Sequence, residues 1–573
     1  MKTLGTDALR ASSKNETGIP PMSENVNAVS VAGENGNATE SEVGAQPAND
    51  RWWHIGFGIL MAVTLIGFLV WSRFYVPEGH FSVVLVITLL LGLFMAFNIG
   101  GNDVANSFGT SVGAGTLTIK QALLIAAVFE IAGAVIAGGE VTDTVRSGIV
   151  NIDAITTDPM DFVYIMMAAL VGAAVWLLIA TKFGLPVSTT HSIIGAIVGA
   201  SLTTGALIGR GSLDTVQWGE IGQIAISWVI SPLLGGIVAY VLFRFIKHSI
   251  LLYNEKADQR LLELKREFIE TTGTTEEHFD RIGYIQTVAY ANARLPKAEA
   301  KMIAAQARAA IEHGLEPTLE AKYDYALKKL DRGVNEVRAQ RAINVYVPLL
   351  AAAGSMVIIS MLLFKGLKNL NLEFTAVQTV AVLAMVGTIS WFGMSMFAKT
   401  LSGKSLSRST FILFSWMQVF TAAAFAFSHG SNDIANAIGP FAGVLDVVKT
   451  GTLNASAAVP MPVLVAFGIA MVVGLWFLGR NVIATVGTTL TKIHPSSGFA
   501  AELAAACVVM LASQLGLPVS STHILIGAVL GVGLVNGAAN WRMMKTIGLA
   551  WVVTLPVAAG IGAGAVMVFR AVF

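Results

Sequence analysis

Long apolar runs separated by short polar connections make up most of the chain. Most runs are long enough for a helix to cross a hydrocarbon core of roughly 30 Å. Before residue 247 they cover residues 55–75, 81–99, 121–138, 162–181, 190–207 and 221–246. After residue 343 they cover residues 345–365, 376–398, 409–427, 461–479, 499–514, 520–537 and 546–572. The pattern predicts an all-α integral membrane protein with about 10–12 transmembrane helices.

Composition supports this fold class and excludes others. Hydrophobic residues make up 54% of the chain and charged residues 13%, whereas soluble domains carry about 25% charged residues. A net charge of +1 argues against nucleic acid as a partner. The single cysteine excludes an intrachain disulfide and a cysteine metal cluster.

The polar stretches divide the chain into four parts. Residues 1–50 lack an apolar period and are predicted to form a disordered tail. Residues 247–343 hold 16 Lys and Arg and 15 Asp and Glu at helical spacing, which predicts a charged helical insert. Residues 51–246 and 344–573 then form two transmembrane repeats.

Basic residues near span ends predict the orientation. Arg244, Lys247, Arg338 and Arg341 flank the insert, whereas the tail holds few basic residues. We therefore expect a cytoplasmic insert and an outside tail. This arrangement needs an odd number of crossings before the insert, so one of the six runs should enter without crossing. The best candidate is the run that begins at "PVSTTH".

Two polar blocks occur twice. "NDVANSFG" (102–109) matches "NDIANAIG" (432–439) at five of eight positions, and "GLPVSTTHSIIGAIVG" (184–199) matches "GLPVSSTHILIGAVLG" (516–531) at eleven of sixteen. The two offsets agree closely, at 433 − 103 = 330 and 523 − 191 = 332 residues. Duplicated halves are typical of secondary transporters, whose site lies at interrupted helices near the membrane midplane.

The first block combines an acid with amides. A backbone break at Gly100–Gly101 would expose a helix N-terminus that attracts an anion, while an ionised Asp103 would attract a cation. An acid buried in the membrane is costly and usually functional. The candidate residues are Asn102, Asp103 and Asn106, and in the second copy Asn432, Asp433 and Asn436.

The second block supplies consecutive hydroxyls at a predicted helix start, where they would form an oxyanion cradle. They are Ser188, Thr189 and Thr190, and in the second copy Ser520, Ser521 and Thr522. A structural alternative is a hydrogen bond from each hydroxyl to its own i−4 carbonyl. His191 and His523 follow as expected hydrogen-bond partners of the helix starts, not metal ligands. Glu130 and Glu502 lie in otherwise apolar runs and are further candidate intramembrane acids.

The duplicated "GGNDVANSFGTSVGAGTLT" and "GSNDIANAIGP", with "GLPVSTTH" and "GLPVSSTH", resemble the inorganic phosphate transporter family, whose sodium-coupled members are the type III sodium–phosphate symporters. The resemblance implies two inverted repeats with discontinuous or re-entrant helices and no enzymatic activity. It implies a symporter of inorganic phosphate in the cytoplasmic (inner) membrane, coupled to sodium or protons, and a homodimer as the usual assembly.

Carried over by position, the resemblance assigns roles to the candidates. Asp103 and Asp433 would bind the coupling cation, with sodium the favoured ion, and Glu130 and Glu502 resemble acids that transport requires. Phosphate would be bound by Asn102, Asn106, Asn432, Asn436, Ser188, Thr189, Thr190, Ser520, Ser521 and Thr522.

Three alternatives remain open at this stage. A sulfate permease of the same family would share every motif. A membrane-embedded phosphatase using Ser or Thr and His would be expected to clamp phosphate with Arg or Lys, and neither block contains one. An anion channel is disfavoured by acids beside the cradle. Affinity, stoichiometry and a metal–phosphate substrate are not readable from the sequence.

Overall fold

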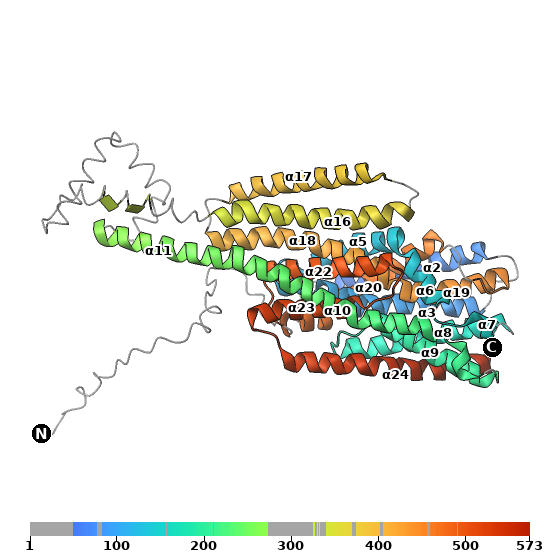
Figure 1. Ribbon diagram of the computed structural model, residues 1–573. Helices are drawn as coiled ribbons and strands as arrows, with labels where there is room; N and C mark the ends of the chain where they lie inside the picture. Colours follow the sequence, from blue (N-terminus) through green and yellow to red (C-terminus); the bar gives the residue numbers. More distant parts are fainter. Residues whose placement is uncertain are drawn as a thin grey trace, which may run out of the picture. The chain divides into compact units, whose positions relative to one another are not determined.

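The computed structural model describes residues 50–76, 83–155, 158–209, 211–272, 325–326, 329–330, 332, 340–369, 374–401, 405–454, 459–489 and 491–573. Regular structure in these ranges is helical, apart from one isolated bridge between Val150 and Val216. Twelve helical stretches in the described ranges are long and apolar enough to cross a membrane. The prediction of an all-α membrane protein is confirmed at this level, and the helices lie side by side (Figure 1).

The first half begins with a long helix that is largely exposed along its length and ends with one that continues into the insert. Its helices are α2 (Arg51–Tyr75), α3 (Val83–Ile99), the π-helix η2 (Gly100–Val104), α4 (Ala105–Gly113), α5 (Ile119–Ala137), α6 (Gly139–Ser147), α7 (Ile152–Ile155), α8 (Pro159–Lys182), α9 (Thr189–Leu207), η3 (Ser212–Thr215) and α10 (Trp218–Ile246).

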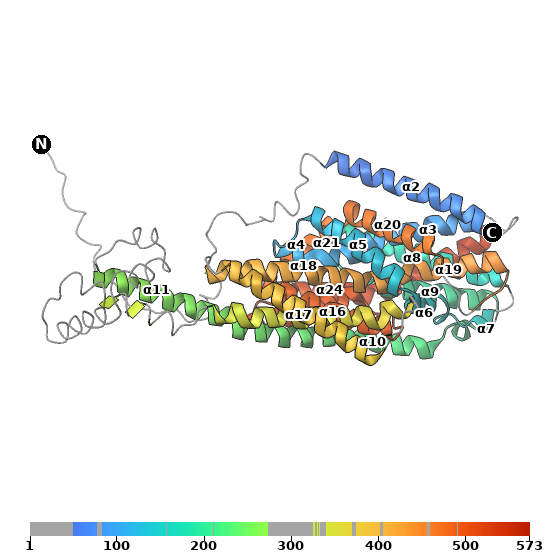
Figure 2. The ribbon, with the colours of Figure 1, turned by 90° about the horizontal axis from the view of Figure 1, so that it is seen from above.

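The second half begins with two long helices that follow the insert. Its helices are η5 (Ala342–Tyr346), α16 (Val347–Asn369), α17 (Ala376–Thr400), α18 (Leu406–Asp433), α19 (Ala435–Thr450), α20 (Met461–Leu478), α21 (Arg480–Ala484), η6 (Thr485–Thr489), α22 (Pro495–Gln514), α23 (Ser521–Asn536) and α24 (Trp541–Val572). Helix α17 lies at one edge of the bundle in Figure 1, and α2 lies at an edge in Figure 2.

A π-helical turn connects α3 to α4, so the expected free helix N-terminus at Gly100–Gly101 is wrong. Ile99 and Ala105 on either side both have helical backbone angles. The glycines serve close packing instead, because a Cβ on Gly100 would lie 1.8 Å from the carbonyl oxygen of Met471. In the second half, α18 and α19 meet with only Ile434 between them.

Helices of one half pack on helices of the other in matched pairs. Helix α10 packs along α23 and α24 packs along α9, while α3 packs on α20 and α18 packs on α5. The closest contacts match as well, since Gly100 meets the carbonyl of Met471 and Gly430 meets that of Glu130. Each half therefore completes its packing only with helices of the other half.

A buried ion pair also joins the halves. Nη2 of Arg146 on α6 lies 2.9 Å from Oδ2 of Asp446 on α19. The same nitrogen donates to the backbone oxygen of Asn454 at 2.9 Å. Only 2% of the Arg146 side chain is exposed, so removing one partner would leave the other charge poorly solvated.

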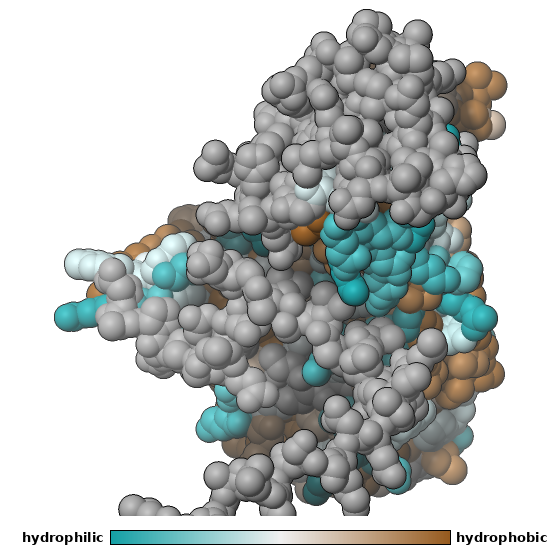
Figure 3. Space-filling view, turned by 90° about the vertical axis from the view of Figure 1, so that its left-hand side faces the viewer, coloured by the Kyte–Doolittle hydropathy of each residue, from teal (hydrophilic) through white to brown (hydrophobic). Residues whose placement is uncertain are grey.

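The first part of the insert is helical. Helix α10 continues through the π-helix η4 (Lys247–Leu251) into α11 (Leu252–Thr272), across the expected boundary at residue 247. The remainder of the insert lies mostly outside the described residues, as does the predicted tail except for Asp50. At the insert-side end of the bundle, Figure 3 shows a hydrophilic surface beside hydrophobic faces. Six candidate spans precede the insert, whereas an outside tail and a cytoplasmic insert need an odd number of crossings. The sidedness of the tail and the insert stays a prediction.

Candidate functional site

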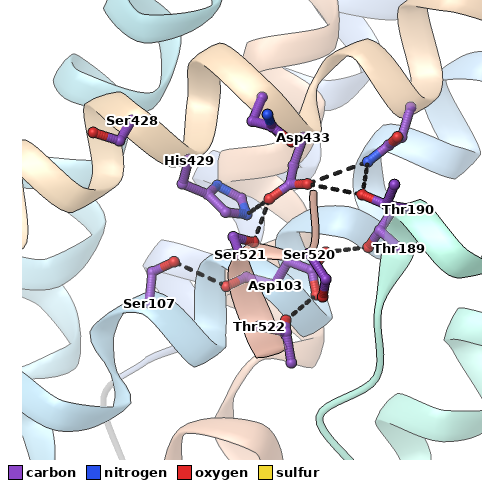
Figure 4. Close-up of polar contacts among 12 residues, drawn as sticks. Asp103, Ser107, Thr189, Thr190, Ser428, His429, Asp433, Ser520, Ser521 and Thr522 are labelled. Carbon is purple, nitrogen blue, oxygen red and sulfur yellow. Dashed lines mark hydrogen bonds and ion pairs between the residues drawn. The ribbon is translucent and has the colours of Figure 1, made fainter. Parts of the chain in front are cut away.

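Both duplicated blocks meet in the interior of the bundle (Figure 4). Asp103 in η2 accepts hydrogen bonds from Thr189 of its own half and from Thr522 of the other half, the latter at 2.7 Å. Asp433 at the end of α18 accepts a hydrogen bond from Ser521 of its own half. We call Asp103, Asp433, Thr189, Thr190, Ser521 and Thr522 the aspartate cluster, and all six are buried.

Thr190 lies farther from its aspartate than the other hydroxyls of the cluster do. Its Oγ1 lies 3.4 Å from Oδ1 of Asp433 and donates to the backbone oxygen of Val519 at 2.9 Å. Asn436 donates to both Thr190 Oγ1 and Asp433 Oδ1, at 3.2 Å in each case. Each aspartate thus faces hydroxyls from both halves, which ties the site to the interface between them.

Ser188 and Ser520 cap the helices that carry the other hydroxyls. Ser188 Oγ accepts from the backbone N–H of His191 at 3.1 Å, and Ser520 Oγ accepts from that of His523 at 3.2 Å. Helices α9 and α23 therefore start beside the aspartates, as Figure 4 shows for Thr189 and Ser521. The first N–H groups of a helix lack i−4 partners and favour an anion.

Asn102 and Asn432 hold the segments that lead into α9 and α23. Asn102 Nδ2 donates to Thr181 Oγ1 at 2.9 Å and to Leu185 O at 3.0 Å, and its Oδ1 accepts from Val187 N at 3.1 Å. Asn432 Nδ2 donates to Ser513 Oγ at 2.9 Å in the equivalent place. The predicted direct contact of these two amides with phosphate stays a prediction.

The first block also contains Ser107 and Asn106. Ser107 Oγ donates to the backbone oxygen of Asp103 at 3.1 Å and does not contact its carboxylate. This is the i−4 bond that a hydroxyl in a helix commonly makes. The side chain of Asn106 lies outside the described residues.

His429 is a site residue that the sequence analysis missed. On α18, its Nε2 lies 3.0 Å from Oδ2 of Asp433 and its Nδ1 lies 2.8 Å from Oε2 of Glu130. The equivalent position in the first half is Ile99, so the histidine is not repeated and a comparison of the two blocks does not select it. A signal was present, because a histidine four residues before an aspartate shares its helix face.

The second acid, Glu502 on α22, lies in a separate polar network. Its Oε1 accepts from Thr110 at 2.6 Å, from Gln418 at 3.1 Å and from Ser111, and its Oε2 accepts from Thr421 at 2.8 Å. Glu130 and Glu502 both contact α18, through His429 and through Gln418 and Thr421. They are both buried, which fits a functional role but does not define it.

His191 and His523 each contact a tryptophan ring, His191 edge-on and His523 at a tilt. Their ring centroids are 4.5 Å apart, His191 lies 3.8 Å from Trp228, and His523 lies 3.7 Å from Trp551. Trp228 is on α10 and Trp551 is on α24, so each histidine contacts a tryptophan of its own half, and the contact between the two histidines joins the halves. These ring contacts favour a packing role for both histidines.

The aspartate cluster suits a cation. One ligand atom each from Asp103, His429 and Asp433 lie within 4.8 Å of one another. Two carboxylates so close repel each other unless a positive charge lies between them. In the described part of the chain no Arg or Lys forms an ion pair with either aspartate; their one ion-pair partner is His429. A bound cation would supply the missing charge.

The comparisons with known proteins agree with one another. The sequence pattern described as the phosphate transporter family matches residues 99–562. A Mycobacterium bovis protein named as a phosphate permease is 56% identical over 91% of this chain and 94% of its own length. A Haemophilus influenzae protein of the same name is 34% identical over 85% of this chain and 97% of its own length. A solved structure named "The sodium-dependent phosphate transporter" aligns with a TM-score of 0.65 and 29% identity over 86% of this chain and all of that chain.

Proposed function

Because the chain belongs to the phosphate transporter family, we propose that the aspartate cluster is where it binds inorganic phosphate together with a coupling cation. The protein is a phosphate permease and not an enzyme. One observation supports this location of the site: each aspartate faces hydroxyls from both halves of the chain. A ligand there would contact both halves at once, as alternating access requires.

The hydrogen bonds suggest how the cation and the anion depend on each other. Thr189, Ser521 and Thr522 now donate their hydroxyl protons to carboxylates. Each hydroxyl has only one proton to donate. A hydroxyl that donates to a carboxylate therefore cannot donate to a phosphate oxygen at the same time. A cation that binds the carboxylates would release these protons toward phosphate. Cation binding would therefore precede phosphate binding and raise its affinity.

Sodium is the favoured coupling ion. Carboxylate and hydroxyl oxygens surround the cluster, and hard cations prefer oxygen ligands; the structural neighbour is itself named as sodium-dependent. Protons are the alternative, because His429 contacts carboxylates through both ring nitrogens and only a protonated imidazole carries hydrogen on both.

The two helix starts would supply the remaining contacts. Thr190 and the first N–H groups of α9 and α23 would bind phosphate oxygens, and Ser188 and Ser520 would hold those helix ends in place as caps. Asn102 and Asn432 would position the segments before them. The predicted inverted repeats, the cytoplasmic insert and a homodimer belong to the same proposal.

Uptake of radiolabelled phosphate into proteoliposomes containing only this protein tests the proposal. Accumulation driven by a sodium gradient, and not by a proton gradient, is the expected result, and excess sulfate should not compete. Accumulation of sulfate instead would reject the phosphate assignment for this protein.

Asp103→Asn locates the site in the same assay. The variant keeps the shape and removes the charge, so it should lose coupled uptake while inserting normally. Asp214→Asn, at an exposed position in η3, is the matched control and should transport at the wild-type rate. Wild-type uptake and cation dependence in Asp103→Asn would place the cation elsewhere.

A further inference from the structure

A cavity of about 620 Å³ lies where α10 leaves the bundle and α23 ends, away from the aspartate cluster. Three neighbouring basic side chains line it: Arg244, Lys247 and His248. Apart from Ser249, its other walls are apolar or aromatic and include Tyr240, Phe245 and Leu534. A cavity with a basic end and apolar walls matches an amphiphile with an anionic head.

The position along α10 agrees with the headgroup level of a bilayer. Trp218 begins the helix and Tyr240 lies 22 residues later, which is roughly 33 Å at 1.5 Å per residue. The hydrocarbon core is roughly 30 Å thick, and Trp and Tyr are enriched at its two edges. Arg244, Lys247 and His248 follow directly after Tyr240, where phosphate headgroups would lie.

One face of α10 changes from apolar to basic at this point. Ile230, Leu233, Ile237 and Val241 are exposed and follow one another at helical spacing. Arg244 is the next residue on the same face. Acyl chains along the apolar part of this face would therefore bring a headgroup to the guanidinium.

The basic groups keep free donors for an anion. Arg244 Nη1 donates to the Tyr240 hydroxyl at 2.9 Å, which uses one of five guanidinium donors. The Lys247 ammonium donates to Val535 O at 3.1 Å and to Asn536 Oδ1 at 3.0 Å, so one of its three protons remains. In the described ranges no carboxylate forms an ion pair with Arg244 or Lys247.

We propose that this cavity binds the phosphate headgroup of one anionic phospholipid, whose acyl chains lie along the exposed apolar face of α10. Arg244 binds phosphate oxygens through its free N–H groups, as guanidinium commonly does. Lys247 both holds the end of α23 and contributes charge. Basic pockets between transmembrane helices bind anionic headgroups in this way.

Native mass spectrometry of the protein purified from vesicles of equal phosphatidylglycerol and phosphatidylcholine tests the proposal. Wild-type protein should retain one phosphatidylglycerol and no phosphatidylcholine. Arg244→Gln should lower the retained fraction at least about tenfold, the factor that corresponds to 1.4 kcal/mol, and Arg244→Lys should restore part of it. Arg542→Gln removes an exposed charge outside the cavity and should retain lipid as wild type does.

Each contrary result overturns the proposal. If Arg244→Gln retains as much phosphatidylglycerol as wild type, the cavity does not hold the lipid. If Arg542→Gln loses as much phosphatidylglycerol as Arg244→Gln does, the loss reflects surface charge and not the cavity. Displacement by millimolar inorganic phosphate would identify a phosphate site in place of a lipid site. A monodisperse gel-filtration peak for Arg244→Gln keeps lipid loss distinct from unfolding.

Discussion

Gly430 on α18 packs against the backbone of Glu130 on α5, and replacing it with alanine should impair transport. A Cβ at residue 430 would lie 2.2 Å from the carbonyl oxygen of Glu130. This neighbour is backbone, so it cannot rotate away as a flexible side chain would. The two helices must move apart for the methyl group to fit.

The required movement follows from the distances. Ordinary van der Waals contact begins at 3.4 Å, so the helices must separate by 3.4 − 2.2 = 1.2 Å. The bond from His429 Nδ1 to Glu130 Oε2 is 2.8 Å, and the same displacement along it gives 2.8 + 1.2 = 4.0 Å, which is no longer a hydrogen bond. Overpacking of this kind costs about 1–3 kcal/mol of stability.

Phosphate uptake and thermal unfolding in detergent, measured on the same preparation, test the prediction. Gly430→Ala should unfold at a lower temperature and take up phosphate at least roughly tenfold more slowly, because displacements of about 1 Å at a working site have such effects. Gly560→Ala is the matched control, since nothing lies within 4 Å of the added Cβ. Wild-type uptake and stability in Gly430→Ala would refute the close approach of α18 and α5.

Three further predictions concern the cluster and the interface between halves. Thr190→Val and Thr522→Val should each weaken apparent phosphate affinity roughly tenfold, since a hydrogen bond to a charged group contributes about 1.5 kcal/mol; an unchanged concentration dependence of uptake would make these hydroxyls structural. His429→Gln should abolish uptake with normal membrane insertion, and normal uptake would exclude the imidazole from coupling. Arg146→Met should lower stability by about 3 kcal/mol by leaving Asp446 unpaired, and adding Asp446→Leu should restore part of the melting temperature; equal melting temperatures of Arg146→Met and wild type would contradict the pair.

Much of the fold could be predicted because its determinants are local. Apolar length predicts membrane helices wherever they pack, and the duplicated blocks identify the two halves without any structure. The positions of Ser188 and Ser520 before helix starts were also readable, because capping depends on neighbouring residues only. These features can be read from neighbouring residues alone, without knowing which residues distant in the chain are in contact.

The features that the sequence did not reveal concern residues whose role depends on distant contacts. The Gly100–Gly101 pair was interpreted as a helix break, but Gly100 lets α3 approach Met471 on another helix. Asn102 holds the segment before α9, a role that the sequence did not indicate, and its contact with phosphate stays a prediction. His429 was missed because its partner Glu130 is 299 residues away, and its repeat position holds an isoleucine.

Because α9 of the first half packs along α24 of the second half, the two halves cannot be completed one after the other during biosynthesis. Helix α9 leaves the ribosome early, yet α24, which packs along it, is made only after residues 208–540. Gly199 on α9 awaits the backbone of Ala559, which its added Cβ would approach to 2.1 Å. Until then α9, which carries Thr189 and Thr190, lacks its packing against α24. A nascent chain therefore remains without an assembled transport site until α24 enters the membrane, and truncation in α24 would disable the first half as well as the second.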